Sequence, residues 1–511
     1  MRQAHARRAR GLWVALGVVA LGGLLLAPLD PADAVTPPDP VAAAHPSAGS
    51  FYPMSTTRLV GGETGATVLP GAPLRVPVLG RPGLPTTGVS AVVLNVTTTA
   101  TGPRAALLGI RPGFGPLATA RPLTSATAPS LGTRTSLVTV PLDPSGAVDV
   151  VASAPAAVTL DLVGLYAADD TVVAMLGPSG GYQPSDPVRL LGPGAGAAAP
   201  ASADDALDPT PSPAPTVDPA LAQALEAGGV RRVAVDLGAE SAQHVTALLV
   251  RVSVVSAPAA GVVTVTASTM ADALVAAPTE ADPGAEPADP TTAASAALTT
   301  PTLSLQRGVT ASNLAVVPAV LDDQGLVRLT VTNGLPAATP VRVDLVGFYD
   351  DGGLGADLRF RALPVGRVLD TRTGFGTGPL AAFGRGVVSP ASDVVGDNTF
   401  GLVGSMTTLT AADRPTDVAL RRAETHPGEI PPTPLASSAG SVPVAAGDQA
   451  TTPVQAEVGD SRGVVLAATT GPAQVVLDVV GSFEAYPAVE DASLRDWVHA
   501  VPSWQVRALV R

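Results

Sequence analysis

Three short sequence patterns recur in the same order three times along this chain of 511 residues, and this repetition constrains the fold more than any other feature. The first pattern is an aromatic residue followed seven positions later by Arg. The second is an Asp-x-x-Gly segment between two alternating apolar runs, and the third is a closing segment of the form Asp-[LV]-Val-Gly-x-aromatic. The repetition predicts three divergent copies of one structural unit.

The opening pattern gives each copy one arginine, and the closing pattern gives it one aspartate. These residues are Arg58 and Asp161 in the first copy, Arg189 and Asp344 in the second, and Arg367 and Asp478 in the third. A charge flanked by apolar residues in a strand has to be paired if it is buried. We therefore expect the opening Arg and the closing Asp of each copy to clasp its first strand to its last. A ligand-binding Arg on each copy is the alternative.

The middle pattern predicts a short hairpin turn in each copy. Its Asp can cap the turn through the side chain, and its Gly can supply the positive φ that such turns need. The predicted turn residues are Asp143 and Gly146, Asp322 and Gly325, and Asp460 and Gly463.

The segments between these anchors are rich in β-branched residues, as in Val89–Thr99, Val245–Val255 and Val262–Ala267. We find no long helical period within a copy. Many short strands with turn signals between them predict an all-β fold. We expect three tandem antiparallel β-sandwich domains, jelly-roll-like and of about eight strands each, after an N-terminal signal segment.

The first residues are typical of an export signal. Arg2, Arg7, Arg8 and Arg10 precede an uncharged apolar run, and residues 32–34 offer a small-x-small cleavage site. The apolar run is short for a membrane-spanning helix, which needs about 20 residues. We therefore favour a cleaved signal peptide (1–34) over an uncleaved anchor, which would be the chain's one contact with the membrane. Either case predicts a protein that is secreted or held on the extracellular face of the cell envelope.

The anchors also divide the rest of the chain. The expected parts are a linker at 35–50, β-domains at 51–166, 182–349 and 360–483, and a C-terminal tail at 484–511. Two Pro-, Ala- and acid-rich insertions in the second domain, near 195–219 and 278–297, are expected to be disordered because they bury too little apolar surface. We expect Trp497 and Trp504 to dock the tail onto the last domain, and binding of a partner is the alternative.

The run Ala91–Thr99, the opening segment Arg367–Gly374 and the three closing segments resemble a family of exported actinobacterial cell-surface β-repeats. That family runs F-x-P-x-x-x-x-R-[LV]-L-D-T-R, then A-V-V-L-N-V-T, then D-V-V-G-[YF]. The likeness covers all three copies, although the segments after Arg58 and Arg189 have lost the Asp and the second Arg of the opening motif. The resemblance implies a location and an architecture, and no defined activity.

Composition and scattered motifs narrow the function classes. A formal net charge of −13 argues against a nucleic-acid partner, whose phosphates need a basic face. Without cysteine the chain has no disulfides and no thiolate metal sites, so its stability must come from burial. The histidines lack ligand spacing, and adjacent acids such as Asp350-Asp351 fit no regular calcium loop. We predict no metal site and no cofactor.

One segment, Gly459-Asp-Ser461-Arg-Gly463, has the form G-x-S-x-G of a hydrolase nucleophile elbow. An elbow needs a strand–turn–helix context and a His partner. Because this segment aligns with the Asp-x-x-Gly turns of the other copies, we predict no catalytic residue, and a serine hydrolase is the weakest alternative.

The sequence thus predicts a non-enzymatic secreted or cell-envelope protein of structural or adhesion type. Its partner would be another envelope protein or a cell-wall polysaccharide. A carbohydrate-binding module is the main alternative, but the Thr-rich strands, which we expect to be exposed, carry few aromatic rings on which a sugar could stack.

Overall fold

The structure is a computed structural model of the chain. It describes residues 46–62, 65–102, 106–113, 132–193, 195, 219–268, 300–354, 357–391, 394–411, 413–423, 439–459, 462–486 and 506–510. The predicted signal peptide, most of the linker, nearly all of the first insertion and the whole of the second lie outside these residues. Pro37–Arg511 forms one compact unit, so the three predicted domains are described below as copies within it.

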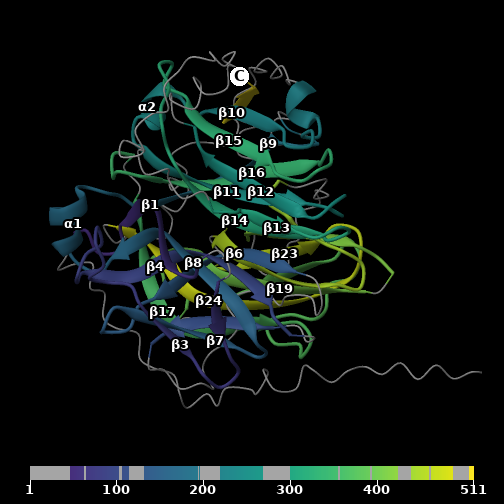
Figure 1. Cartoon of the computed structure of the whole chain (residues 1–511), viewed down its shortest axis with the longest axis horizontal. Helices are drawn as coiled ribbons and strands as arrows, with labels where there is room; N and C mark the ends of the chain where they lie inside the picture. Colours follow the sequence, from purple (N-terminus) through teal and green to yellow (C-terminus); the bar gives the residue numbers. More distant parts are fainter. Residues whose placement is uncertain are drawn as a thin grey trace, which may run out of the picture. The chain divides into compact units, whose positions relative to one another are not determined.

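Antiparallel strands make up most of the described chain, which confirms the predicted all-β fold class (Figure 1). In the first copy one sheet has the order β1-β8-β4-β6, with β2 also on β8, and the other has the order β3-β7-β5. The strands are β1 (Phe51–Val60), β2 (Ala66–Val68), β3 (Leu74–Pro77), β4 (Val89–Ala100), β5 (Leu108–Pro112), β6 (Thr133–Pro141), β7 (Ala147–Ala152) and β8 (Ala156–Ala167).

The second copy has the sheet orders β9-β16-β11-β14 and β10-β15-β12-β13. Its strands are β9 (Tyr182–Leu191), β10 (Val230–Asp236), β11 (Val245–Val254), β12 (Gly261–Ala267), β13 (Leu303–Leu305), β14 (Ala311–Pro318), β15 (Val327–Asn333) and β16 (Val341–Asp350). The short helices α1 (Thr171–Leu176) and α2 (Ala239–Ala242) and a 3-10 turn at Pro219–Ala222 lie in the connections. In the part of the chain that the structure describes, no helix is long and apolar enough to cross a membrane.

The third copy has the orders β17-β24-β19-β22 and β18-β23-β20-β21. Its strands are β17 (Asp357–Asp370), β18 (Arg385–Val388), β19 (Thr399–Thr410), β20 (Thr416–Arg422), β21 (Val442–Val444), β22 (Gln449–Glu457), β23 (Val464–Ala468) and β24 (Ala473–Tyr486). The first sheets of the second and third copies join through one pairing, Leu358 with Tyr182, into a single sheet of eight strands.

The strand order is therefore the same in each copy, and it is the order of a jelly roll. The first strand pairs with the last, and most successive strands lie in opposite sheets, while β12 and β13, like β20 and β21, are neighbours in one sheet. The described part of the first copy holds no counterpart of β13 and β21, because residues 114–131 lie outside it. Apolar side chains such as Leu94, Leu248 and Leu477 fill the copies, and burying this surface is the main driving force for folding.

The Asp-x-x-Gly segments are not hairpins, contrary to the sequence prediction. Strand β6 belongs to the first sheet and β7 to the second, and the same holds for β14 and β15 and for β22 and β23. The turns at Asp143–Gly146 and Asp322–Gly325, and the connection from β22 to β23, therefore carry the chain from one sheet to the other. The sequence of a hairpin and that of a connection between two sheets look alike, since both have an alternating run on each side of a turn. Alternation shows that a strand has one buried face, but it does not show which strand it pairs with.

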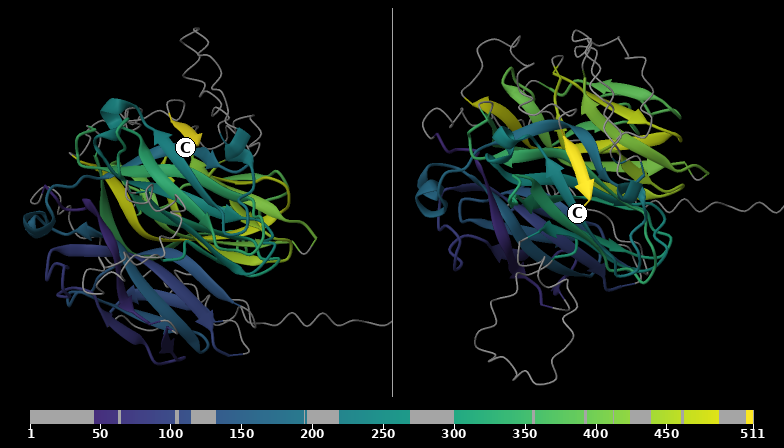
Figure 2. Two further views of the ribbon diagram at one scale, coloured as in Figure 1. Left: turned by 45° about the horizontal axis from the view of Figure 1, so that its top comes forward. Right: turned by 90° about the horizontal axis from the view of Figure 1, so that it is seen from above.

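The tail joins the second copy and not the last. Strand β25 (Arg507–Val510) pairs with β10, the edge strand of the second copy's sheet β10-β15-β12-β13 (Figure 2). An edge strand offers unpaired backbone groups that any extended segment can complete, so a short tail strand carries no sequence signal for its partner. Trp497 and Trp504 lie outside the described residues.

Candidate functional site

The structure brings together the predicted Arg–Asp pair of the first copy. Arg58 on β1 and Asp161 on β8 are partners in the strand register. The Arg58 Nε donates to Asp161 Oδ1 at 2.5 Å, and its Nη2 donates to Oδ2 at 3.2 Å. This two-pronged geometry is the strongest form of an Arg–carboxylate contact. The carboxylate is buried, while 29% of the Arg58 side chain remains exposed.

The other two copies repeat this contact. Arg189 Nε donates to Asp344 Oδ1, and its Nη2 reaches Oδ2 at 3.3 Å. In the third copy Arg367 donates to the two oxygens of Asp478 at 2.9 and 3.1 Å. Burial opposes the charge of Arg367, but its bonds to Asp478 and to Asp370 outweigh burial and raise its pKa above the ordinary value. All three pairs thus join the first strand of a copy to its last.

The third copy alone keeps the full opening motif, and there the pair grows into a network. Asp370 Oδ2 accepts from Arg367 Nη1 at 3.1 Å and from Arg372 Nη2 at 2.6 Å. The hydrogen bond from Arg372 is the main reason why the pKa of Asp370 lies below its ordinary value.

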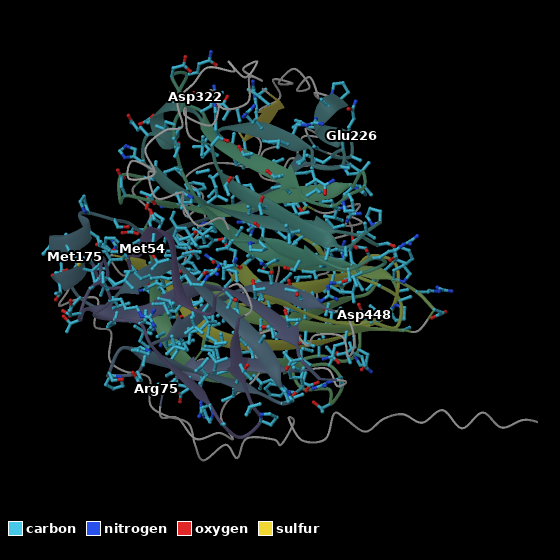
Figure 3. All side chains as sticks on the ribbon, in the orientation of Figure 1. Met54, Arg75, Met175, Glu226, Asp322 and Asp448 are labelled. Atoms are coloured by element: carbon cyan, nitrogen blue, oxygen red, sulfur yellow. The ribbon has the colours of Figure 1, made fainter. Side chains whose placement is uncertain are left out.

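The Asp-x-x-Gly turns are built as the sequence predicts at their first residue. Asp143 Oδ1 accepts from the backbone N–H of Ala147 at 2.8 Å, and Asp322 Oδ1 accepts from that of Leu326 at 2.9 Å. Burial opposes the ionised form of Asp322, but this backbone bond and the Arg328 guanidinium outweigh burial and lower its pKa. Figure 3 labels Asp322 and Arg75, the ion-pair partner of Asp143, at opposite ends of the view, so these two turns do not converge on one site.

Gly146 and Gly325 have the predicted positive φ. The third turn departs from the pattern. Asp460 lies outside the described residues, and Arg462, next to Gly463, has a φ of 56°.

Six aromatic rings meet where the three copies join. They are the opening and closing rings of the three copies: Phe51 and Tyr166, Tyr182 and Tyr349, and Phe360 and Phe483. All six are at least 95% buried. The sequence predicted a core role for these rings, but it gave no signal for which copy each would contact.

The rings connect the copies in a closed cycle. Phe51 of the first copy stacks on Tyr349 of the second, with ring centroids 4.0 Å apart. Tyr182 of the second stacks on Phe483 of the third at 4.6 Å, and Phe360 of the third stacks on Tyr166 of the first at 4.2 Å. The opening ring of every copy therefore lies on the closing ring of another. A hydrogen bond of 2.8 Å joins the Tyr166 and Tyr349 hydroxyls within the cluster.

The glycine of each closing motif provides the space for the opening ring of its own copy. A Cβ on Gly164 would lie 2.3 Å from Phe51 Cζ, one on Gly347 would lie 2.5 Å from Tyr182 Cε2, and one on Gly481 would lie 2.2 Å from Phe360 Cε2. Real Cβ atoms do not approach other atoms so closely. The recurrence of Gly at this position therefore follows from the recurrence of the ring.

A second junction forms where β6, β14 and β22 contact one another. Thr135 and Ser304 share a hydroxyl hydrogen bond of 2.7 Å, and Asn313 Oδ1 accepts from the Leu137 N–H at 2.8 Å. Thr452 donates to the Ser312 carbonyl at 3.0 Å. The sequence placed the Thr-rich strands at the surface. Parts of them are instead buried between copies, where their hydroxyls satisfy the polar groups of neighbouring strands.

The structure gives the G-x-S-x-G segment no elbow context. Ser461 itself lies outside the described residues, but the segment connects strand β22 to strand β23, whereas a nucleophile elbow leads into a helix. Among the described residues no group of three or more His, Asp or Glu side chains is arranged to hold a metal ion. His244, the one described histidine, bonds to Asp351 at 3.0 Å.

No family model matches this chain, and no curated protein matches it. Among solved structures, a chain of Sulfolobus Turreted Icosahedral Virus has 8% identity and a TM-score of 0.14, over 85% of this chain and 91% of that one. The tandem CBM22 domains of Paenibacillus barcinonensis Xyn10C have 11% identity and a TM-score of 0.14, over 50% and 80%. TM-scores this low have no bearing on function.

Proposed function

We propose that this chain is a non-enzymatic structural protein that is secreted or held on the extracellular face of the cell envelope, where its three copies act as one folded block. The observation that carries the proposal is where the repeated residues lie. The Arg–Asp pairs join strands within a copy, and the aromatic rings and their glycines join the copies. Among the described residues, the features that define the repeat thus serve the fold.

The location can be tested by expressing the full chain in an actinobacterial host and treating intact cells with proteinase K. The proposal predicts that the protein is found in the medium or is degraded on intact cells. A cytoplasmic control protein should survive until the cells are broken. Full protection of the chain in intact cells would contradict an extracellular location.

The absence of serine-hydrolase activity can be tested with a fluorophosphonate probe on the purified chain. The proposal predicts no covalent labelling. Labelling that disappears in Ser461→Ala and persists in Ser145→Ala, a serine in the equivalent turn of the first copy, would establish a serine hydrolase instead.

Binding of cell-wall polysaccharide is a second candidate, because two aromatic rings are exposed on one segment of the third copy. Phe375 is 54% and Phe383 is 75% exposed, and both lie between β17 and β18. Exposed rings can stack on sugars. Saturable binding to isolated cell walls that is lost in Phe375→Ala and Phe383→Ala would support this role. No binding by the folded chain would favour a scaffold whose partner is a protein.

A further inference from the structure

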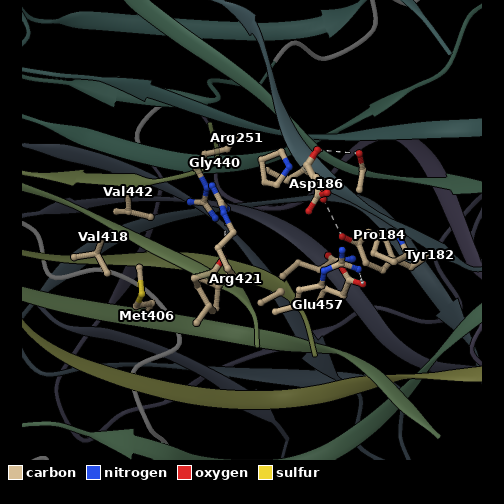
Figure 4. Close-up of a pocket in the computed structure, with 18 residues that line it drawn as sticks. Tyr182, Pro184, Asp186, Arg251, Met406, Val418, Arg421, Gly440, Val442 and Glu457 are labelled. Atoms are coloured by element: carbon tan, nitrogen blue, oxygen red, sulfur yellow. Dashed lines mark hydrogen bonds and ion pairs between the residues drawn. The ribbon is translucent and has the colours of Figure 1, made fainter. Parts of the chain in front are cut away.

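A small cavity lies between the second and third copies (Figure 4). The second copy contributes Tyr182 and residues 184–187 from β9 and Arg251 from β11, and the third contributes Arg421 from β20 and residues of β19, β21 and β22. Its volume of about 40 Å³ has room for a few particles of the size of water, and for no sugar or peptide.

Arg251 is 4% exposed and lacks a full set of partners. Its Nη2 donates to the Pro453 carbonyl at 3.2 Å, and its Nη1 makes a long contact of 3.4 Å with Ser312 Oγ. Its Nε is buried without a hydrogen-bond partner. No carboxylate of the described residues forms an ion pair with it, although Asp344 lies opposite it in the sheet and favours its charged form. Buried charges are normally paired.

Arg421 brings a second guanidinium to the same cavity. Its hydrogen bonds go to backbone carbonyls, those of Leu420 and Ala439, and no described carboxylate forms an ion pair with it. Burial is the main cause that lowers the pKa of Arg251 to about 10. Asp344 opposes this shift, and the positive charge of Arg421 adds to it. Both arginines line the cavity, so each of the two copies contributes a positive charge to it.

The nearby carboxylates of the described residues form no ion pair with Arg251 or Arg421. Asp344 is already bonded to Arg189 and accepts from the Gly440 N–H at 2.7 Å. Glu457 lies 3.4 Å from the guanidinium of Arg422. Asp186 lines the cavity. Burial lowers the pKa of Arg421, and Asp186 and Asp344 oppose this shift without forming an ion pair with its guanidinium.

The same register position is neutral in the other copies. Arg251 lies opposite Asp344 in the sheet, whereas Asn95 lies opposite Asp161 and Ser405 opposite Asp478. Asn95 uses its amide to donate to the neighbouring copy, at Thr300 and Pro301. The jelly roll therefore does not require a cation at this position, and Arg251 serves the cavity of the second copy in particular.

We propose that Arg251 and Arg421 bind a small monovalent inorganic anion, of the size of chloride, between the second and third copies. The anion supplies the ion-pair partner that neither arginine finds among the described residues and an acceptor for the buried Nε of Arg251. Its contacts join β11 of one copy to β20 of the next, so it strengthens the closed arrangement of the copies.

Bromide is the direct probe. The full chain is crystallised with sodium bromide in place of chloride, and diffraction is recorded at the bromine absorption edge. The proposal predicts an anomalous peak within hydrogen-bonding distance of both guanidinium groups. Bromide peaks elsewhere on the protein, with none in this cavity, would overturn it.

Thermal unfolding of the full chain supplies an independent test in solution. Chloride is added at constant ionic strength against sodium methanesulfonate, whose anion is too large for the cavity. A ligand that binds the folded state raises Tm in a saturable way, and we expect this rise in the wild type and in the control Arg414→Met, whose side chain is 63% exposed. The rise should be lost in Arg251→Met. It should also be lost in Arg421→Met, which should disturb folding less because the Arg421 side chain is only half-buried. An equal rise in all four proteins would contradict the proposal.

Discussion

The Arg–Asp clasps and the aromatic junction occupy the same two strands of every copy but join different things. A clasp connects the first strand of a copy to its own last strand, as Arg189 does to Asp344. A ring at the start of the same strand, Tyr182, stacks instead on Phe483 of the next copy. The first and last strands of a copy are therefore held together by an ion pair, and the same two strands contact the other copies through their aromatic rings.

This difference shows why the first and last strands carry most of the repeated residues. The clasp keeps the two strands in register, and that register places the opening ring over the closing glycine of its own copy. In this place each opening ring stacks on the closing ring of another copy.

The largest expected effect comes from breaking the junction at its most connected ring. Tyr166 contacts Phe51 and Phe360 and bonds to the Tyr349 hydroxyl. We expect Tyr166→Ala to lower the free energy of unfolding by about 3–5 kcal/mol, the usual cost of truncating a large buried ring. Guanidinium unfolding of the full chain measures the loss. The exposed Phe383→Ala should cost less than about 0.5 kcal/mol, and equal losses in the two variants would contradict the junction.

Breaking a clasp should cost a similar amount where it is fully buried. Arg189→Met leaves Asp344 buried without its partner, and such a loss costs about 3–5 kcal/mol. Arg58→Met should cost less, because 29% of the Arg58 side chain is exposed against 8% for Arg189. The double variant Arg189→Met with Asp344→Leu should recover part of the stability. An unchanged free energy of unfolding in Arg189→Met would show that the clasp plays no structural role.

A buried acid beside the junction should make stability depend on pH. Burial raises the pKa of Asp357 to about 6, Arg359 opposes this shift, and Asp350 adds to it. The folded state therefore holds a proton that the unfolded state has lost between pH 4 and pH 6, and this group's contribution to stability falls as pH rises through that range. The contribution of Asp357 to the free energy of unfolding should fall by about 3 kcal/mol over this range. Asp357→Asn should remove it, as measured by the difference between variant and wild-type unfolding at pH 4 and pH 7. An identical pH profile in the two proteins would contradict a raised pKa.

The smallest effect is expected from a variant that keeps all six rings of the junction but fills the space beside one of them. Gly481→Ala should push Phe360 away and cost about 1–3 kcal/mol, as overpacking does. Gly378→Ala is the matched control, because a Cβ there meets nothing within 4 Å. A Gly481→Ala protein as stable as this control would mean that the ring does not need the space.

The clasps could be predicted from the sequence because both partners recur and both stand in apolar surroundings. The ring partners could not, since Phe51 and Tyr349 belong to different copies and nothing local to either residue names the other. The Asp-x-x-Gly pattern predicts a turn but not the sheets that it connects. Arg251 was missed although it left a signal, a lone cation in the apolar run Leu248–Val252.

Hydrogen exchange measured by mass spectrometry on the Tyr166→Ala chain tests the joining of the three copies most directly. The closed cycle predicts faster exchange in β8 of the first copy and also in β16 of the second and β24 of the third, whose rings lose a partner or a neighbour. Arg58→Met serves as the comparison, and its effect should be concentrated in β1 and β8. Faster exchange confined to the first copy in the Tyr166→Ala chain would contradict the account.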